Sequence, residues 1–116
     1  MMQAATIGFN TEYSEDATSL EEIHGLSGLT LLEFGAPWCG HCQAARNAMK
    51  EAINEHSGLV HIKVFDGKGK RLGRQFAVKL WPTLILLRDG KEVERIVRFT
   101  SAEEVRRLLS FSHDPI

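Results

Sequence analysis

A short apolar segment that runs directly into a helix is the sequence feature that most restricts the fold. Residues 29–34 (Leu-Thr-Leu-Leu-Glu-Phe) lie between Gly28 and Gly35 and predict a buried strand. Small and apolar side chains recur at three- and four-residue steps over residues 40–56, which predicts a helix. Residues 59–65 alternate between apolar and polar side chains and predict a second strand. A strand, a helix and a strand in this order predict a parallel pair.

The rest of the chain extends this unit into one sheet. Thr83–Leu87 and Glu92–Arg98 predict two antiparallel strands, because the Asp89-Gly90 dipeptide between them favours a tight hairpin turn. Three further helices are predicted: over residues 15–24, within residues 67–79, and after the capping box of Ser101 and Glu104. The expected fold class is therefore α/β, with a central mixed β-sheet flanked by helices on both faces.

Length and composition predict a single domain over residues 1–116. A chain of 116 residues buries roughly two-thirds of its unfolded surface on folding, and 43% of its residues are hydrophobic. No internal repeat or linker divides it. Residues 1–14 carry the weakest pattern, and we expect them to be poorly ordered. Nothing in the sequence indicates an obligate oligomer, so a monomer is expected.

The charge distribution argues against nucleic-acid and membrane partners. Residues 1–58 carry a net charge of −6 and residues 59–116 a net charge of +5, for a total of −1. The basic cluster is short and has no interleaved aromatic residues, which favours a solvated helix face; it comprises Lys68, Lys70, Arg71 and Arg74. No segment approaches the ~20 apolar residues of a membrane span, and Met1–Asn10 lacks the pattern of a targeting signal. A cytoplasmic location is expected.

The chain has two cysteines, Cys39 and Cys42, where the first strand leads into the helix. Two are too few for a disulfide framework, but a spacing of three places both sulfurs in the first turn of the helix. The free N–H groups and the dipole of that turn favour a thiolate at Cys39, which makes it the expected nucleophile. Cys42 lies one turn deeper and is suited to resolve a mixed disulfide. His41 lies between them and can carry positive charge, which would stabilise the thiolate further and make the disulfide more oxidising.

Haem attachment and zinc binding are the other uses that a cysteine pair can have. Haem attachment requires histidine directly after the second cysteine, and Gln43 stands there instead. A zinc site needs two more ligands, and none of the histidines forms a second pair at finger spacing; they are His24, His41, His56, His61 and His113. A redox pair without a metal is therefore favoured, with a zinc-bound domain as a minor alternative.

The residues around the cysteines resemble a known family. Trp38-Cys39-Gly40-His41-Cys42, preceded by Phe34-Gly35-Ala36-Pro37 and followed by Trp81-Pro82-Thr83, is similar to the active site of thioredoxin-fold thiol–disulfide oxidoreductases. The resemblance covers about residues 29–109 and implies the thioredoxin fold. Thioredoxins usually carry proline where this chain has His41, and the Cys-Gly-His-Cys variant matches protein disulfide isomerase domains.

The resemblance also implies roles for individual residues. Pro82 is expected to follow a cis bond and to face the cysteines, leaving the Trp81 backbone to pair with an extended substrate. The implied substrate-contact residues are Trp38, Gly40, His41, Trp81, Pro82, Thr83 and Arg98. Arg98 stands where the family commonly has glycine, which favours acidic or smaller substrates.

Glu33 is the one acidic residue in the buried strand, where an ionised carboxylate costs several kcal/mol unless it is paired. The resemblance implies that Glu33 lies beneath Cys42 and takes its proton through water, and that Lys63 lies near this acid. The implied catalytic residues are therefore Cys39, Cys42, Glu33 and Lys63. An exposed position on a strand is the alternative for both Glu33 and Lys63.

The sequence thus predicts a thiol–disulfide oxidoreductase that reduces or exchanges disulfides in protein substrates. Its partners would be those substrates and a thiol reductant, either a reductase or glutathione, and neither a cofactor nor a metal is expected. The alternative is a protein-binding module of the same fold whose cysteines act as a redox switch without turnover.

Overall fold

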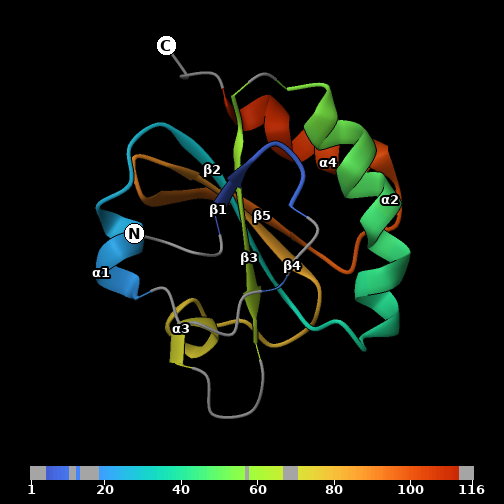
Figure 1. The fold of residues 1–116 in the computed structure, drawn as a ribbon, viewed down its shortest axis with the longest axis horizontal. Helices are drawn as coiled ribbons and strands as arrows, with labels where there is room; N and C mark the ends of the chain where they lie inside the picture. The colour runs from blue at the N-terminus through green and yellow to red at the C-terminus, as the bar shows by residue number, and fades with distance from the viewer. Residues whose placement is uncertain (1–4, 11–12, 14–18, 57, 67–70, 113–116) are drawn as a thin grey trace.

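The computed structural model describes residues 5–10, 13, 19–56, 58–66 and 71–112. Its centre is a five-stranded sheet in the order β1-β3-β2-β4-β5, crossed by helices on both faces (Figure 1). The strands are β1 (Ala5–Ile7), β2 (Leu29–Gly35), β3 (Val60–Phe65), β4 (Thr83–Arg88) and β5 (Lys91–Val97). The helices are α1 (Leu20–His24), α2 (Gly40–Asn54), α3 (Arg71–Gln75) and α4 (Ala102–Leu109), followed by a short 3-10 helix, η1 (Ser110–Ser112).

The sheet is mixed, as the sequence predicts. β2 and β3 are parallel, whereas β4 is antiparallel to both β2 and β5. Asp89 and Gly90 join β4 to β5, and both have positive φ angles (50° and 78°), as the predicted tight turn requires. The sequence did not predict β1, which pairs antiparallel with β3 and adds a fifth strand at the edge.

The predicted helices are present, with shifted ends. α2 ends at Asn54, two residues before the predicted end, and the Ser101–Glu104 capping box begins α4 as expected. The helix predicted over residues 15–24 begins at Leu20, because Ser19 forms an N-terminal capping box with Glu22. The earlier part of that prediction, residues 15–18, lies outside the described residues.

Apolar side chains form one core on each face of the sheet. α2 and α4 pack on the face that carries Leu31, Leu84 and Leu86, and they lie together to the right of the sheet in Figure 1. α1 and α3 contribute Ile23 and Leu72 to the core on the opposite face. Glu33 points toward the first of these faces, because side chains alternate along β2.

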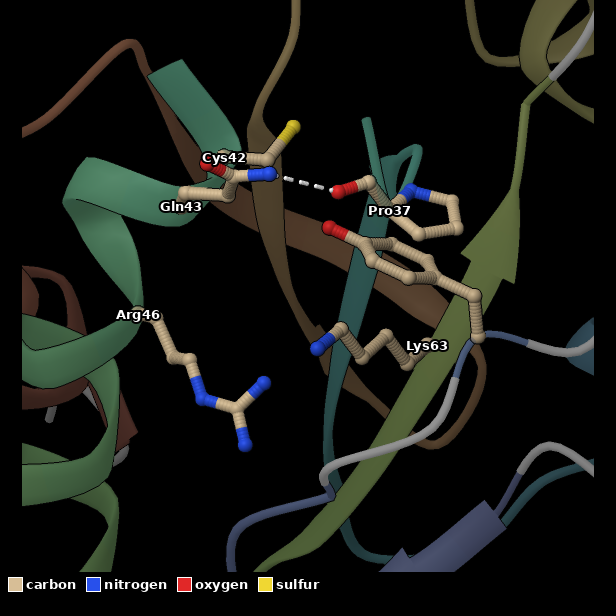
Figure 2. Close-up of a pocket in the computed structure, with 6 residues that line it drawn as sticks. Pro37, Cys42, Gln43, Arg46 and Lys63 are labelled. Carbon is tan, nitrogen blue, oxygen red and sulfur yellow. Dashed lines mark hydrogen bonds between the residues drawn. The ribbon is translucent and has the colours of Figure 1, made fainter. Parts of the chain in front are cut away.

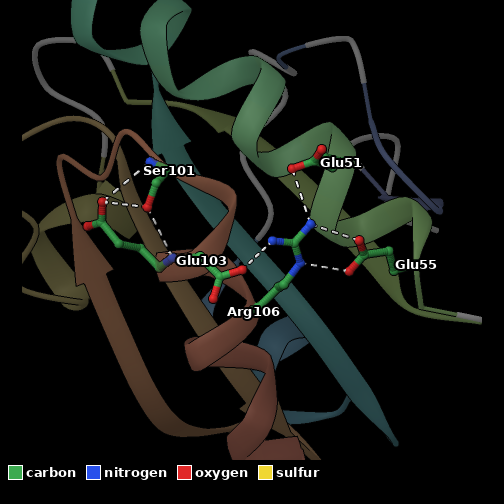
Figure 3. A network of polar contacts seen from close by, with 6 residues as sticks. Glu51, Glu55, Ser101, Glu103 and Arg106 are labelled. Atoms are coloured by element: carbon green, nitrogen blue, oxygen red, sulfur yellow. Dashed lines mark hydrogen bonds and ion pairs between the residues drawn. The ribbon is translucent and has the colours of Figure 1, made fainter.

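Exposed ion pairs join the two helices that cover this face. Figure 3 shows the Arg106 guanidinium of α4 between Glu51 and Glu55 of α2, at 3.2 and 2.9 Å. Glu103, one turn earlier in α4, binds the same guanidinium. These side chains are largely exposed and screened by water, so the ion pairs contribute little to stability, and the buried side chains hold α4 against α2.

In the described part of the chain, no helix is both long and apolar enough to cross a membrane.

Candidate active site

The two cysteines lie where β2 ends and α2 begins, and their surroundings differ. Cys39 is the N-cap of α2, and its Sγ accepts a hydrogen bond from the Cys42 backbone N–H at 3.3 Å. It is partly exposed, whereas the Cys42 side chain is buried, and both are free thiols. The helix N-terminus therefore presents its N–H groups to the sulfur that solvent and substrates can reach.

The Cys42 thiol is held in its protonated form. Burial, followed by a hydrogen bond to Cys39, raises the pKa of Cys42 from its ordinary value near 9 to about 12. Gly35 makes room for this sulfur, because a side-chain carbon there would lie 2.6 Å from Cys42 Sγ and 2.8 Å from the Tyr13 hydroxyl. Cys42 can attack a disulfide only after its proton has been removed.

Glu33 is fully buried and accepts two hydrogen bonds. The Tyr13 hydroxyl donates to Glu33 Oε2 at 3.0 Å, and His61 Nε2 lies 2.8 Å from Glu33 Oε1. The Asn10 backbone N–H donates to His61 Nδ1 at 2.9 Å, so the hydrogen of a neutral His61 ring lies on Nε2 and donates to Glu33. Each carboxylate oxygen thus has a donor, which is how a buried ionised carboxylate is stabilised.

Lys63 is 3% exposed, and its Cα lies opposite that of Glu33 in the parallel pairing of β2 with β3. Its Nζ lies 4.2 Å from the centre of the Tyr13 ring and 5.8 Å from that of Phe9, within the range of cation–π contacts. The structure therefore places both predicted acid–base residues inside the protein, and the exposed-strand alternatives for Glu33 and Lys63 are wrong.

A small cavity of about 100 Å³ opens beside Cys42. Figure 2 shows Arg46 of α2 and Lys63 of β3 reaching into it from opposite sides. Gln43 closes one end by donating to the Pro37 carbonyl at 2.8 Å. The cavity is positively charged and roomy enough for a few water molecules next to the buried sulfur.

The segment before β4 has the predicted cis bond, between Trp81 and Pro82. The Trp81 indole N–H donates to Asp66 Oδ2 at 2.8 Å, which fixes the ring at the end of β3. Thr83 is 1% exposed, and its hydroxyl donates to the Leu80 carbonyl, which stabilises this loop on its buried side.

Arg98 lies beside the same segment in a conformation that favours glycine. Its φ angle is +51°, and its backbone N–H donates to the Pro82 carbonyl at 2.9 Å. The Arg98 side-chain Nε donates to the Trp81 carbonyl at 3.1 Å. A substrate strand that used this carbonyl would have to displace the guanidinium, so Arg98 alters the surface that the resemblance implies.

The remaining predicted contact residues lie at the entrance. Trp38 is 66% exposed and packs edge-on against Phe65, with 5.0 Å between ring centres. Gly40 and His41 form the exposed first residues of α2. Among the described residues, no group of three or more His, Cys, Asp and Glu side chains is arranged to hold a metal ion.

The sequence reasoning missed three residues of this site: Asn10, Tyr13 and His61. His61 lies two residues before Lys63 in the same strand, so both side chains point to one face of the sheet, the face of Glu33. The strand pattern in the sequence therefore contained the signal for His61. Asn10 and Tyr13 come from a segment without a periodic pattern, and only their tertiary contacts place them at Glu33.

The fold and the site define a thioredoxin-fold protein with a dithiol at a helix N-terminus. Comparison with known proteins agrees with this class. The profile of the thioredoxin family matches residues 11–111. Thioredoxin from Chlamydia trachomatis is 37% identical over 84 residues, which cover 72% of this chain and 82% of that protein.

A solved structure, reduced thioredoxin 2 from Pseudomonas aeruginosa, is similar with a TM-score of 0.79 and 48% identity, covering 88% of this chain and 95% of that one. The chain therefore belongs to the thioredoxin family. It is a protein-disulfide oxidoreductase with a Cys-x-x-Cys active site, as the sequence predicted. The family implies protein-disulfide substrates and a reductase partner.

Proposed function

We propose that this protein works as a reductase of protein disulfides, with Cys39 as the nucleophile, Cys42 as the resolving thiol and Glu33 as the proton acceptor. The observation that carries the proposal is the difference between the two sulfurs. Cys39 is partly exposed and receives a backbone hydrogen bond at the helix N-terminus, whereas Cys42 is buried and its raised pKa of about 12 keeps it protonated.

The reaction follows from this difference. The Cys39 thiolate attacks one sulfur of the substrate disulfide, and the other substrate sulfur leaves as a thiolate. Cys42 then loses its proton and attacks Cys39, which releases the second substrate sulfur and forms the Cys39–Cys42 disulfide. Two electrons pass from the enzyme to the substrate, and a thiol reductant, either a reductase or glutathione, restores the dithiol.

Glu33 and Lys63 support the second step. At pH 7, a thiol with a pKa near 12 is ionised in only ~1 molecule in 10⁵, so Cys42 needs a base. The Glu33 carboxylate is the buried base on this face, and the nearby Lys63 ammonium compensates its charge. Both side chains are almost inaccessible to solvent, which strengthens their interaction.

The substrate surface in this proposal surrounds the exposed edge of Cys39. Trp38, His41 and the Trp81-Pro82 segment supply its contacts, and Leu80 adds an apolar side chain that is 47% exposed. Arg98 supplies a positive charge at the Trp81 carbonyl, which favours acidic substrate segments.

The direction of the reaction depends on how strongly the reduced form is stabilised. Burial keeps Cys42 as a thiol, and His41 is exposed, so water weakens its effect on Cys39. Equilibration with glutathione should therefore give a potential near the thioredoxin value of about −270 mV. His41→Ala should change it by less than about 30 mV, and a potential near −200 mV or above would contradict the reductase direction.

Turnover is tested by the reduction of insulin with a chemical thiol as the electron source. Wild-type protein should accelerate it, and Cys39→Ser should fall to the background rate. Equal rates for the two proteins would favour the binding module, with the cysteines acting only as a switch.

A further inference from the structure

The buried site contains a side chain that the mechanism above does not use. The Tyr13 hydroxyl donates to Glu33 Oε2 at 3.0 Å, and Tyr13 and Cys42 line the same small cavity. Both the hydroxyl and Cys42 Sγ crowd the same point above Gly35, within 2.8 Å of where a side-chain carbon would lie. Tyr13 therefore bridges the resolving thiol and the buried acid.

We propose that the Tyr13 hydroxyl carries the proton of Cys42 to Glu33 in the step that releases the reduced substrate. The inference deepens the proposed function and rests on the roles assigned there to Cys39 and Cys42. Tyr13 takes the place of the water that the family resemblance implies between the thiol and the acid.

The bonds in this step balance. Cys42 Sγ–H gives its proton to Tyr13 Oη while the Tyr13 O–H proton passes to Glu33 Oε2. The Cys42 thiolate then attacks Cys39 Sγ, the bond between Cys39 and the substrate breaks, and the substrate sulfur leaves with the electron pair. Tyr13 ends the step protonated, as before, and Glu33 holds the proton until the dithiol is restored.

The substrate itself makes Tyr13 necessary. In the free dithiol, Cys39 Sγ lies next to Cys42 and accepts a hydrogen bond from its backbone N–H at 3.3 Å, so this sulfur can accept the proton. In the mixed disulfide, that sulfur is bonded to the substrate and carries no charge. Tyr13, which lies beside Cys42 over Gly35 and donates to the Glu33 carboxylate, then connects the thiol to the acid.

The neighbours of Glu33 direct the proton to one oxygen. His61 already donates to Oε1, and its other nitrogen is occupied by the Asn10 N–H, so the ring cannot accept the proton. Oε2 faces Tyr13 and is the oxygen open to it. Among the described residues that line the cavity, the charged groups are the ammonium of Lys63 on β3 and the guanidinium of Arg46 on α2.

The surroundings of Tyr13 keep it in the acid form that a relay needs. The Lys63 ammonium lies 4.2 Å from the ring centre and holds the ring in place. Burial and the negative charge of Glu33 both raise the pKa of Tyr13 above its ordinary value, so the hydroxyl passes a proton on without becoming a free tyrosinate.

The test separates the two sulfur steps. Reduced protein is mixed with an aryl disulfide that releases one coloured thiolate when Cys39 attacks and a second when Cys42 attacks. Tyr13→Phe keeps the ring under Lys63 but removes the hydroxyl. We expect the first phase to be unchanged and the second to slow at least 10-fold, a modest share of what proton transfer contributes in enzymes.

Phe9→Leu is the matched control, because Phe9 also lies against Lys63 and His61 but is not hydrogen-bonded to the thiol. It should leave both phases within about twofold of wild type. A Tyr13→Phe second phase within twofold of wild type would overturn the relay. Loss of the first phase in wild type would instead overturn the proposed function.

Two further readouts distinguish a relay from a merely structural role. In Tyr13→Phe, only preformed thiolate reacts, so the second phase should rise about 10-fold per pH unit between pH 7 and 9, more steeply than in wild type. In a Glu33→Gln background, Tyr13→Phe should add less than a twofold effect. An equal slowing in both backgrounds would show that Tyr13 does not act through Glu33.

Discussion

His61→Leu tests whether the buried network holds Glu33 as the structure indicates. The change removes the donor 2.8 Å from Glu33 Oε1 and the acceptor of the Asn10 N–H, at a site where His61 and Glu33 are both fully buried. Leucine is close to histidine in size, so the main effect is the loss of these two hydrogen bonds.

The magnitude follows from what is left unpaired. A buried charged acceptor that loses its donor costs about 1.5–3 kcal/mol, and a buried backbone N–H without an acceptor costs about 1–3 kcal/mol. We therefore expect His61→Leu to lower the free energy of unfolding by about 3–5 kcal/mol. This is a large share of the 5–15 kcal/mol typical of a domain.

Urea unfolding of the reduced protein at pH 7 measures this difference. His24→Leu is the control, because His24 is exposed at the end of α1 and its replacement should change stability by less than about 0.5 kcal/mol. The double variant Glu33→Leu/His61→Leu should be at least about 1 kcal/mol more stable than His61→Leu, since it removes the buried carboxylate whose Oε1 has lost its donor. A loss below 1 kcal/mol in His61→Leu would refute the reasoning.

Two other predictions concern Cys42 and Arg98. Because burial raises the pKa of Cys42 to about 12, the reduced protein should have its full stability below pH 9 and lose it as the pH rises from 9 toward 12. The disulfide form lacks this thiol, so denaturant curves of the two forms should diverge above pH 9, and parallel losses would contradict the burial effect. Arg98→Gly removes the cation at the Trp81 carbonyl and suits the φ angle of +51°. It should lower the ratio of turnover on acidic over basic disulfide peptides at least about twofold, and an unchanged ratio would exclude Arg98 from substrate selection.

The predictable part of the fold came from strong local patterns. β2, β3 and the β4–β5 hairpin were placed to within a residue or two, because their apolar runs and the Asp89-Gly90 turn are local signals. β1 was missed, since a three-residue edge strand has too few side chains to show an alternation and depends on pairing with β3.

The candidate site also has a part that local sequence patterns indicate and a part that they do not. The spacing of Cys39 and Cys42, their place at the start of a helix and the Trp81-Pro82-Thr83 segment favoured a reactive dithiol from the sequence alone. These features can be predicted from the sequence because neighbouring residues determine where a strand leads into a helix and which side chains share a face of the strand.

Only the tertiary structure decided what holds Glu33 and what connects it to Cys42. Tyr13 is 20 residues from Glu33 along the chain, and His61 is 28 residues from it, yet each lies at hydrogen-bond distance from the same carboxylate. A buried charge can take its partners from any segment that the fold brings near, and their positions leave no period or spacing in the sequence.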